Sequence, residues 1–229
     1  MAGFSGYNFF ETSKSSLETF KPIISEKESF PDFFKEITRQ LVTFETDNGA
    51  LKQESLSYEE KVKIQDKDIA SIESGETILE TRIEKGNYGE EKVDQDLRDK
   101  SYDRISIDMI LDVKQKTHTD GETSTGRQGI DGVYYNKDGH PPYLIVEAKY
   151  GTGQLGITED GKQMCDNWID NRLDKAVGKE KADEIRMANL FGQDQVGAYL
   201  AHIDESGNVT YDKLDQYANV IEKGVNIGC

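Results

Sequence analysis

The sequence predicts an α/β fold in which helices flank a mixed central sheet and a helical extension precedes the sheet. Strand-like segments follow one another between residues 103 and 151, and a hairpin is expected nearer the C-terminal end. Helical segments stand on either side of the first strands. In residues 1–82 the only clear periodicity is helical. We therefore divide the chain into an extension, residues 1–82, and an α/β domain, residues 83–229.

The extension is interpreted as a delivery or docking segment. After residues 1–25, which have no clear period, SFPDFFKEITRQLV (29–42) is predicted to be helical, with Pro31 in the first turn. A second helix, SYEEKVKIQDKDIASI (57–72), opens with a capping box from Ser57 to Glu60. Its apolar stripe is narrow for so charged a helix, so it needs a neighbour, either the next domain or a partner.

The α/β domain is predicted to begin with a helix and to continue through three strands. A polar loop (119–128) and the turn KDGHPP separate these strands. The expected segments, in chain order, are a helix at 88–99, strands at 103–115, 129–136 and 143–151, helices at 161–178 and 179–192, a hairpin at 196–214 and a last helix reaching residue 222.

Composition narrows the class of protein. The chain has 229 residues, 35% of them hydrophobic and 31% charged, which is typical of a soluble protein with a solvated surface. No run of about 18 apolar residues predicts a membrane span, and no Sec-type signal is recognised at the N-terminus. Cys165 and Cys229 are the only cysteines, so neither a disulfide framework nor a structural zinc site is expected. The net charge of −16, taken alone, argues against a nucleic-acid partner.

Charged residues on an apolar strand are the main candidates for chemistry. In YLIVEAKYG, alternation places Glu147 and Lys149 on one face, about 7 Å apart. Asp131 lies one hairpin earlier and comes near Glu147 if the two strands pair, although the sequence leaves their register open. Carboxylates gathered at one spot repel unless a divalent cation neutralises them, and oxygen ligands suit Mg²⁺ or Mn²⁺ better than Zn²⁺. A neighbouring lysine can stabilise the charge that develops on a phosphate, so the set suits phosphodiester hydrolysis.

These residues resemble the PD-(D/E)xK nuclease superfamily. Asp131 is followed by fifteen residues and then by Glu147-Ala-Lys149. The strings KGNYGEEKVDQDL, QGIDGVYYN, PPYLIVEAKYG and GKQMCDNWIDNRL are also similar to C-terminal nuclease domains of bacterial polymorphic and contact-dependent toxins. The resemblance covers residues 83–175.

The resemblance implies a restriction-endonuclease-like core and a metal-dependent endonuclease, with DNA favoured over RNA or tRNA as substrate. It implies an antibacterial toxin that a cognate immunity protein neutralises. Such a protein is made in the bacterial cytoplasm, exported without a Sec-type signal and active in the cytoplasm of the target cell.

The resemblance also assigns roles to particular residues. The helix acid is Glu90, preferred to Glu91 because it shares a helical face with core residues; Asp131 is the central metal ligand and Glu147 the second. Lys149 is the catalytic lysine, and Gln163 occupies the place of a glutamine on the following helix. The metal is Mg²⁺ or Mn²⁺, with Zn²⁺ as a further option. The candidates for substrate binding are Arg127, Lys162 and Tyr150.

Plainer interpretations stand beside these roles. Glu90 could close a capping box with Asn87, and Asp131 could be a turn acid. A Glu-x-Lys pair on a strand is more often a surface ion pair. The alternative function is a non-catalytic acidic binding or immunity-type protein on a nuclease-like scaffold. A metal hydrolase acting on another substrate is a third option.

Overall fold

The computed structural model describes residues 56–114, 129–192 and 194–228. The chain divides into two compact units, Met1–Ser55 and Leu56–Cys229, and only the second is described below. The predictions for residues 1–25, the helix at 29–42 and the loop at 119–128 lie outside the described residues.

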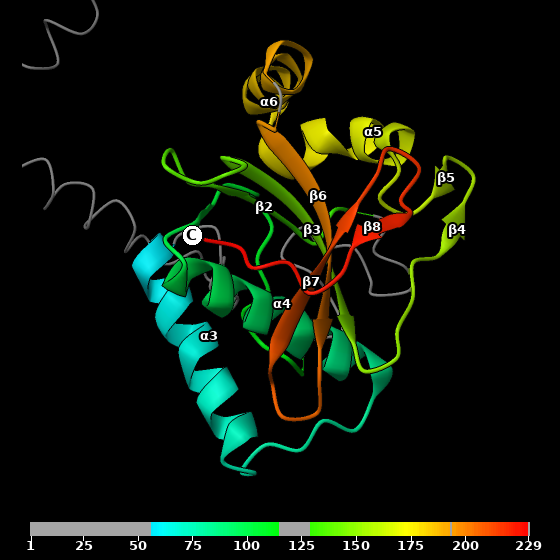
Figure 1. Cartoon of the computed structure of the whole chain (residues 1–229). Coiled ribbons are helices and arrows are strands. Elements are labelled where there is room, and N and C mark those ends of the chain that lie inside the picture. The colour runs from blue at the N-terminus through cyan, green and yellow to red at the C-terminus, as the bar shows by residue number, and fades with distance from the viewer. Residues whose placement is uncertain (1–55, 115–128, 193, 229) are drawn as a thin grey trace, which may run out of the picture. The chain divides into compact units, whose positions relative to one another are not determined.

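A six-stranded mixed sheet forms the centre of the second unit (Figure 1). The strands lie in the order β1-β2-β3-β6-β7-β8; β3 and β6 are parallel, and all other neighbours are antiparallel. The strand bounds are β1 Asp103–Arg104, β2 Gly132–Tyr135, β3 Tyr143–Tyr150, β6 Val196–Ile203, β7 Val209–Leu214 and β8 Val220–Glu222. A separate two-stranded hairpin consists of β4 Ile157–Thr158 and β5 Gly161–Lys162.

Helices cover both faces of the sheet, which confirms the predicted α/β class and mixed sheet. On one face α4 (Arg82–Asp99) buries Val93 and Leu97 against Leu144 and Val146 of β3. On the other face α5 (Asp166–Val177) and α6 (Lys179–Phe191) pack on a second core cluster that includes Ile145. Helix α3 (Tyr58–Glu73) lies against α4 (Figure 1). The predicted boundary between residues 82 and 83 therefore falls in the first turn of α4, a helix that contacts α3.

The first two helices begin at capping boxes. The predicted box from Ser57 to Glu60 is present at α3. The predicted start of the next helix at residue 88 is wrong, because Thr81 and Glu84 form a capping box that starts α4 at Arg82. Glu90 therefore lies in the middle of α4 and does not cap it.

The central hairpin agrees with its prediction. β2 and β3 pair antiparallel across the turn at residues 136–142, and β3 ends one residue before the predicted end. The helix at 179–192 and the late hairpin at 196–214 are also present.

Three predicted segments are wrong. Of the strand at 103–115, only Asp103–Arg104 belongs to the sheet; residues 105–114 form a loop in which Met109 and Leu111 are buried without a strand partner, and residue 115 lies outside the described residues. The helix predicted from residue 161 begins only at Asp166, because β5 occupies Gly161–Lys162. The last helix is instead β8.

The loss of that last helix has a local cause. The Asp215 carboxylate accepts hydrogen bonds from the main-chain nitrogens of Tyr217 and Asn219 and so forms a tight turn. The chain then returns along β7.

Within the residues described, no helix combines the length and apolar character needed to cross a membrane.

Candidate active site

The β2–β3 hairpin places Asp131 beside Glu147. Gly132 is paired with Val146, so Asp131, one residue earlier, is level with Glu147. The Asp131 Oδ2 atom accepts a hydrogen bond of 2.9 Å from the main-chain nitrogen of Ala148. The register that the sequence left open therefore brings the two acids together.

Glu147 is a buried acid with two donors on one oxygen. Its side chain is 2% exposed. Oε1 accepts hydrogen bonds from Lys149 Nζ at 2.6 Å and from Gln163 Nε2 at 2.7 Å. Oε2 is buried and has no hydrogen-bond partner among the described residues. A buried oxygen without a partner is costly, so this atom needs a ligand or a proton.

Burial disfavours the charged forms of both Glu147 and Lys149. Desolvation, and then the nearby Asp131 carboxylate, raise the pKa of Glu147 well above its usual value, although Lys149 acts in the opposite direction. Burial acts to lower the pKa of Lys149, but Glu147 and Asp131 more than offset this, and the pKa of the ammonium is raised. Lys149 is therefore a protonated, positively charged neighbour of Glu147 and Asp131.

Glu90 is the α4 acid on the sheet side. Its charge contributes to raising the pKa of both Glu147 and Lys149. Glu91 is fully buried, and its charged neighbours are led by Asp68 of α3. Consecutive helical residues point about 100° apart, so one acid of this pair can face the sheet while the other faces α3.

Gln163 reaches the site from a position the sequence did not predict. It lies between β5 and α5 rather than on a helix. Its Oε1 accepts a hydrogen bond of 2.9 Å from the nitrogen of Gly156, while its Nε2 donates to Glu147. The hydrogen bond from Gly156 thus holds the Gln163 amide in one orientation.

The candidates for substrate binding are not gathered at this site. Lys162 Nζ donates to the main-chain oxygen of Ala218 at 2.6 Å. The Tyr150 ring packs edge-on against Tyr88, with centroids 6.1 Å apart, and Lys85 Nζ lies 5.9 Å from the Tyr150 centroid. Arg127 lies outside the described residues.

The acids of the predicted ligand set lie around Glu147. In the described ranges, no three Asp, Glu, His or Cys side chains are grouped closely enough to hold a metal ion. Glu90, Asp131 and Glu147 act on one another electrostatically, but Lys149 already pairs with Glu147. In the structure as it stands, this ammonium supplies the positive charge.

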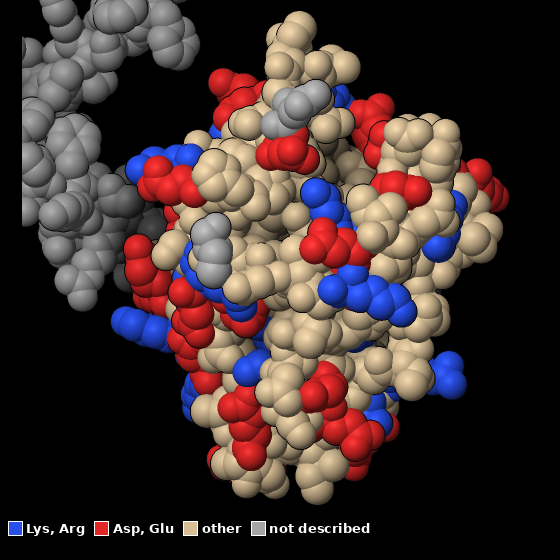
Figure 2. All heavy atoms as spheres, in the orientation of Figure 1, with Lys and Arg blue, Asp and Glu red and all other residues tan. Residues whose placement is uncertain are grey.

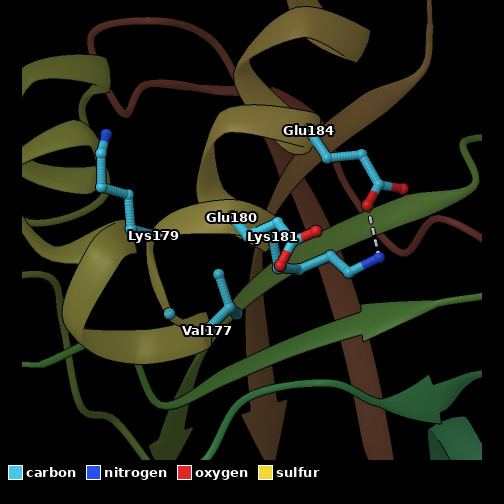
Figure 3. A pocket seen from close by; sticks show the side chains of 6 residues that line it. Val177, Lys179, Glu180, Lys181 and Glu184 are labelled. Carbon is cyan, nitrogen blue, oxygen red and sulfur yellow. Dashed lines mark hydrogen bonds and ion pairs between the residues drawn. The ribbon is translucent and has the colours of Figure 1, made fainter. Parts of the chain in front are cut away.

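A surface hollow lies elsewhere and shares no residue with these acids (Figure 3). It is formed at the turn between α5 and α6, where Lys181 pairs with Glu184 at 2.5 Å. The Tyr143 hydroxyl donates to Glu184. Tyr143 begins β3, whereas Glu147 and Lys149 lie near its end, so the hollow is at the opposite end of the strand.

The surface carries mixed charge. On the face shown in Figure 2, acidic and basic side chains are interspersed, and no broad basic area is seen. A nucleic-acid substrate would therefore depend on local charge rather than on a general basic footprint.

Sequence reasoning missed a buried polar cluster behind the site. Gln65, Asp94 and Arg104 are buried and hydrogen-bonded to one another or to a shared partner. The available signal was on α4, where Asn87, Glu91 and Asp94 recur at helical spacing on a buried face.

Comparisons with family models, curated proteins and solved structures return no match to this chain.

Proposed function

We propose that the chain is a metal-dependent nuclease that hydrolyses phosphodiester bonds, with DNA favoured over RNA or tRNA. The observation that carries this proposal is the buried Glu147 carboxylate. Within the described part of the chain it has one oxygen without a partner, an acid level with it just before β2, and an ion-paired lysine two residues away. Such a set of perturbed ionisable groups is a candidate for chemistry rather than for stability.

The residues fit a divalent cation in their chemistry. Asp131 and Glu147 offer only oxygen atoms as ligands, which Mg²⁺ and Mn²⁺ prefer. Glu90 is near enough for its charge to act on Glu147. The unpartnered Oε2 of Glu147 is the atom most in need of a ligand. When bound, the cation would supply positive charge that polarises a phosphate and lowers the pKa of water.

Lys149 and Gln163 have separate roles in this proposal. The Lys149 ammonium would stabilise negative charge that builds up on the phosphate oxygens during hydrolysis. Gln163, held by Gly156, fixes Oε1 of Glu147 and so aims Oε2 in one direction. Neither role needs a covalent intermediate with the chain.

The PD-(D/E)xK core is part of this proposal, and the fold contributes to it only a mixed central sheet flanked by helices. Helix α4, the antiparallel strands β1 to β3, the α5–α6 crossover and the parallel strand β6 follow one another along the chain. The site lies near the end of the central strand β3.

The decisive experiment is a cleavage assay with the full chain. Plasmid DNA and tRNA are incubated with Mg²⁺, Mn²⁺ or Zn²⁺, and with a chelator. We expect cleavage that needs the cation and that Asp131→Asn abolishes. Asp138→Asn, in the exposed turn of the same hairpin, is the matched control and should cleave normally. Cleavage that persists in Asp131→Asn or in chelator contradicts the proposal.

The biological role we propose is that of an antibacterial toxin neutralised by an immunity protein. Expression of the chain in bacteria should then be toxic, with loss of DNA or cleavage of tRNA, and Asp131→Asn should remove the toxicity. The second candidate, a non-catalytic acidic binding protein, is favoured by the net charge of −16. A pure, folded chain that cleaves neither nucleic acid with any of the three cations would support that candidate instead.

A further inference from the structure

A buried guanidinium lies behind Asp131. Arg104 is the last residue of β1, and its side chain is 2% exposed. Its Nη2 donates to the main-chain oxygen of Asp131 at 2.7 Å, and Nε donates to that of Asp108 at 3.1 Å. One side chain therefore joins the loop after β1 to the residue that precedes β2.

The charge of Arg104 is neutralised on the side away from the acids of the site. Nη1 forms an ion pair with Asp94 of α4, whose side chain is 3% exposed. Asp94 also accepts hydrogen bonds from Tyr134 Oη at 2.6 Å and from Gln65 Nε2 at 2.8 Å. Asp94 of α4 and Tyr134 of β2 thus hold the guanidinium directly, and Gln65 of α3 holds Asp94.

On the β1 side of the sheet, Asp131 has no paired residue at its level. β1 ends at Arg104, which is paired with Tyr134, so no residue of β1 is paired with Asp131. The Arg104 side chain reaches the Asp131 carbonyl instead. On the other side, the Ala148 nitrogen donates to the Asp131 carboxylate. The main chain and the side chain of Asp131 are therefore fixed by different neighbours.

Stability alone does not explain a charged pair in this place. A buried ion pair can commonly be replaced by packed apolar side chains without loss of stability. A guanidinium offers several donors in a rigid planar fork, which a lysine ammonium does not reproduce. The fork is used here to reach two carbonyls and a carboxylate at once.

We propose that Arg104, neutralised by Asp94, is a positioning residue that holds the Asp131 carboxylate level with Glu147. The inference rests on the proposed function, because it takes Asp131 as a ligand of the divalent cation. Arg104 acts through Asp131, whose main-chain oxygen accepts the hydrogen bond from Nη2.

The test is Arg104→Lys, which keeps a positive charge for Asp94 and removes the fork. The hydrogen exchange of the Ala148 amide, which bonds to the Asp131 carboxylate, reports the position of Asp131 directly. We expect this amide to exchange at least about tenfold faster, while other β3 amides keep their rates. Affinity for Mn²⁺, measured by titration without substrate, should fall about 10–100-fold. In the cleavage assay kcat should fall while KM is unchanged.

Arg186→Lys is the matched control. It alters an equally forked guanidinium, one that pairs with Asp170 and Asp174 on the surface of α5. Exchange at Ala148, Mn²⁺ affinity and cleavage should be those of the wild type. If Arg104→Lys does not fold, the double variant Arg104→Met/Asp94→Asn removes both buried charges and is measured in the same way.

The outcomes separate this inference from the proposed function. Wild-type exchange at Ala148 together with wild-type Mn²⁺ affinity in a folded Arg104 variant overturns the inference, whether or not the chain cleaves. Faster exchange at Ala148 and weaker Mn²⁺ binding, in a chain that cleaves no nucleic acid, overturn the nuclease proposal and leave the role of Arg104 standing. If the wild type binds no Mn²⁺, the proposed function fails, and exchange at Ala148 alone decides whether Arg104 positions Asp131.

Discussion

Glu91 and Glu147 are both buried glutamates, but their surroundings differ in kind. Neither oxygen of Glu91 has a hydrogen-bond partner among the described residues, and its charged neighbours are acids: Asp68, Asp94, Asp112 and Glu90. Glu147 has a lysine and a glutamine on one oxygen and leaves only the other without a partner. Burial raises the pKa of both, to about 10 for Glu91.

The difference shows that burial of an acid does not by itself make a site. Glu91 has no donor or cation to hold an ionised form, so we expect it to be a neutral carboxylic acid at pH 7. Glu147 has a charged partner in Lys149. The Gln163 amide also donates to the Glu147 carboxylate and so orients it. Only the second arrangement can hold negative charge ready for a ligand.

The strongest test of the difference between Glu91 and Glu147 is the substitution Glu147→Gln. The change keeps the shape of the side chain and removes the charge, so we expect cleavage to fall about 10³-fold, within the range attributed to single electrostatic groups in active sites. Initial rates on plasmid DNA at saturating Mg²⁺ measure this. Glu91→Gln is the matched variant and should cleave at the wild-type rate; equal losses in both would remove the distinction between the two acids.

Lys149→Met should have the next largest effect. It keeps the length of the side chain and removes the ammonium from Glu147, so we expect kcat to fall about 10²-fold. Single-turnover rates measure the chemical step. A control with Lys137→Met, in the exposed hairpin turn, should leave the rate unchanged. Unchanged kcat in Lys149→Met would argue that its charge serves only to balance Glu147.

Gln163→Leu should have a smaller effect, of about tenfold on kcat and on the Mg²⁺ concentration needed for half-maximal rate. The reason is that Gln163 only orients Oε1 of Glu147, and Lys149 still donates to the same oxygen. A rate titration with Mg²⁺ measures both quantities. A loss as large as that of Glu147→Gln would show that Gln163 acts on the substrate itself.

Glu91→Gln should change stability rather than activity. The folded-state pKa of about 10 lies above the ordinary value of 4.5, so the folded chain keeps a proton that the unfolded chain releases. The free energy of unfolding of the wild type should therefore fall as the pH rises from about 4.5 towards 10. The variant lacks this loss and should be more stable by at least about 1 kcal/mol at pH 8, since one pKa unit corresponds to about 1.4 kcal/mol.

Urea unfolding at pH 4 and pH 8 measures this effect. At pH 4, where both states hold the proton, variant and wild type should agree closely. Glu205→Gln, on the exposed turn between β6 and β7, is the control; it retains Glu91, so its stability should fall between pH 4 and pH 8 as that of the wild type does. A wild type whose stability rises from pH 5 to pH 8 by the same amount as that of Glu91→Gln would show that Glu91 ionises freely.

The sequence predicted the hairpin that carries the site because the signals there are local. A two-residue period and a turn rich in Gly and Pro fix β2, β3 and the side on which Glu147 and Lys149 lie. The register of β2 against β3 follows from the length of the turn between them. The sequence-based prediction did not use that length and left the register open.

The remaining features depend on contacts far apart in the chain. After Arg104, the main-chain nitrogens of Ile105 and Ser106 still bond to β2, at the Val133 oxygen. The alternation further on reflects burial of side chains such as Val113 in the core. Gln163 meets Glu147 through a small hairpin whose pairing covers four residues, too few for a periodic pattern. The polar contacts of Arg104 with Asp94 join β1 to the middle of α4 and have no local signature.

The parallel pairing of β3 with β6 has a consequence for the order of folding. The β2–β3 hairpin closes over a short turn, so Asp131 and Glu147 can be aligned early. Leu200, the residue of β6 opposite Glu147, arrives only after α5 and α6 have been made. On the ribosome, the two acids could thus stand side by side while both are still hydrated. The dry setting that raises the pKa of Glu147 would form in a late step, when β6 takes its place in the sheet.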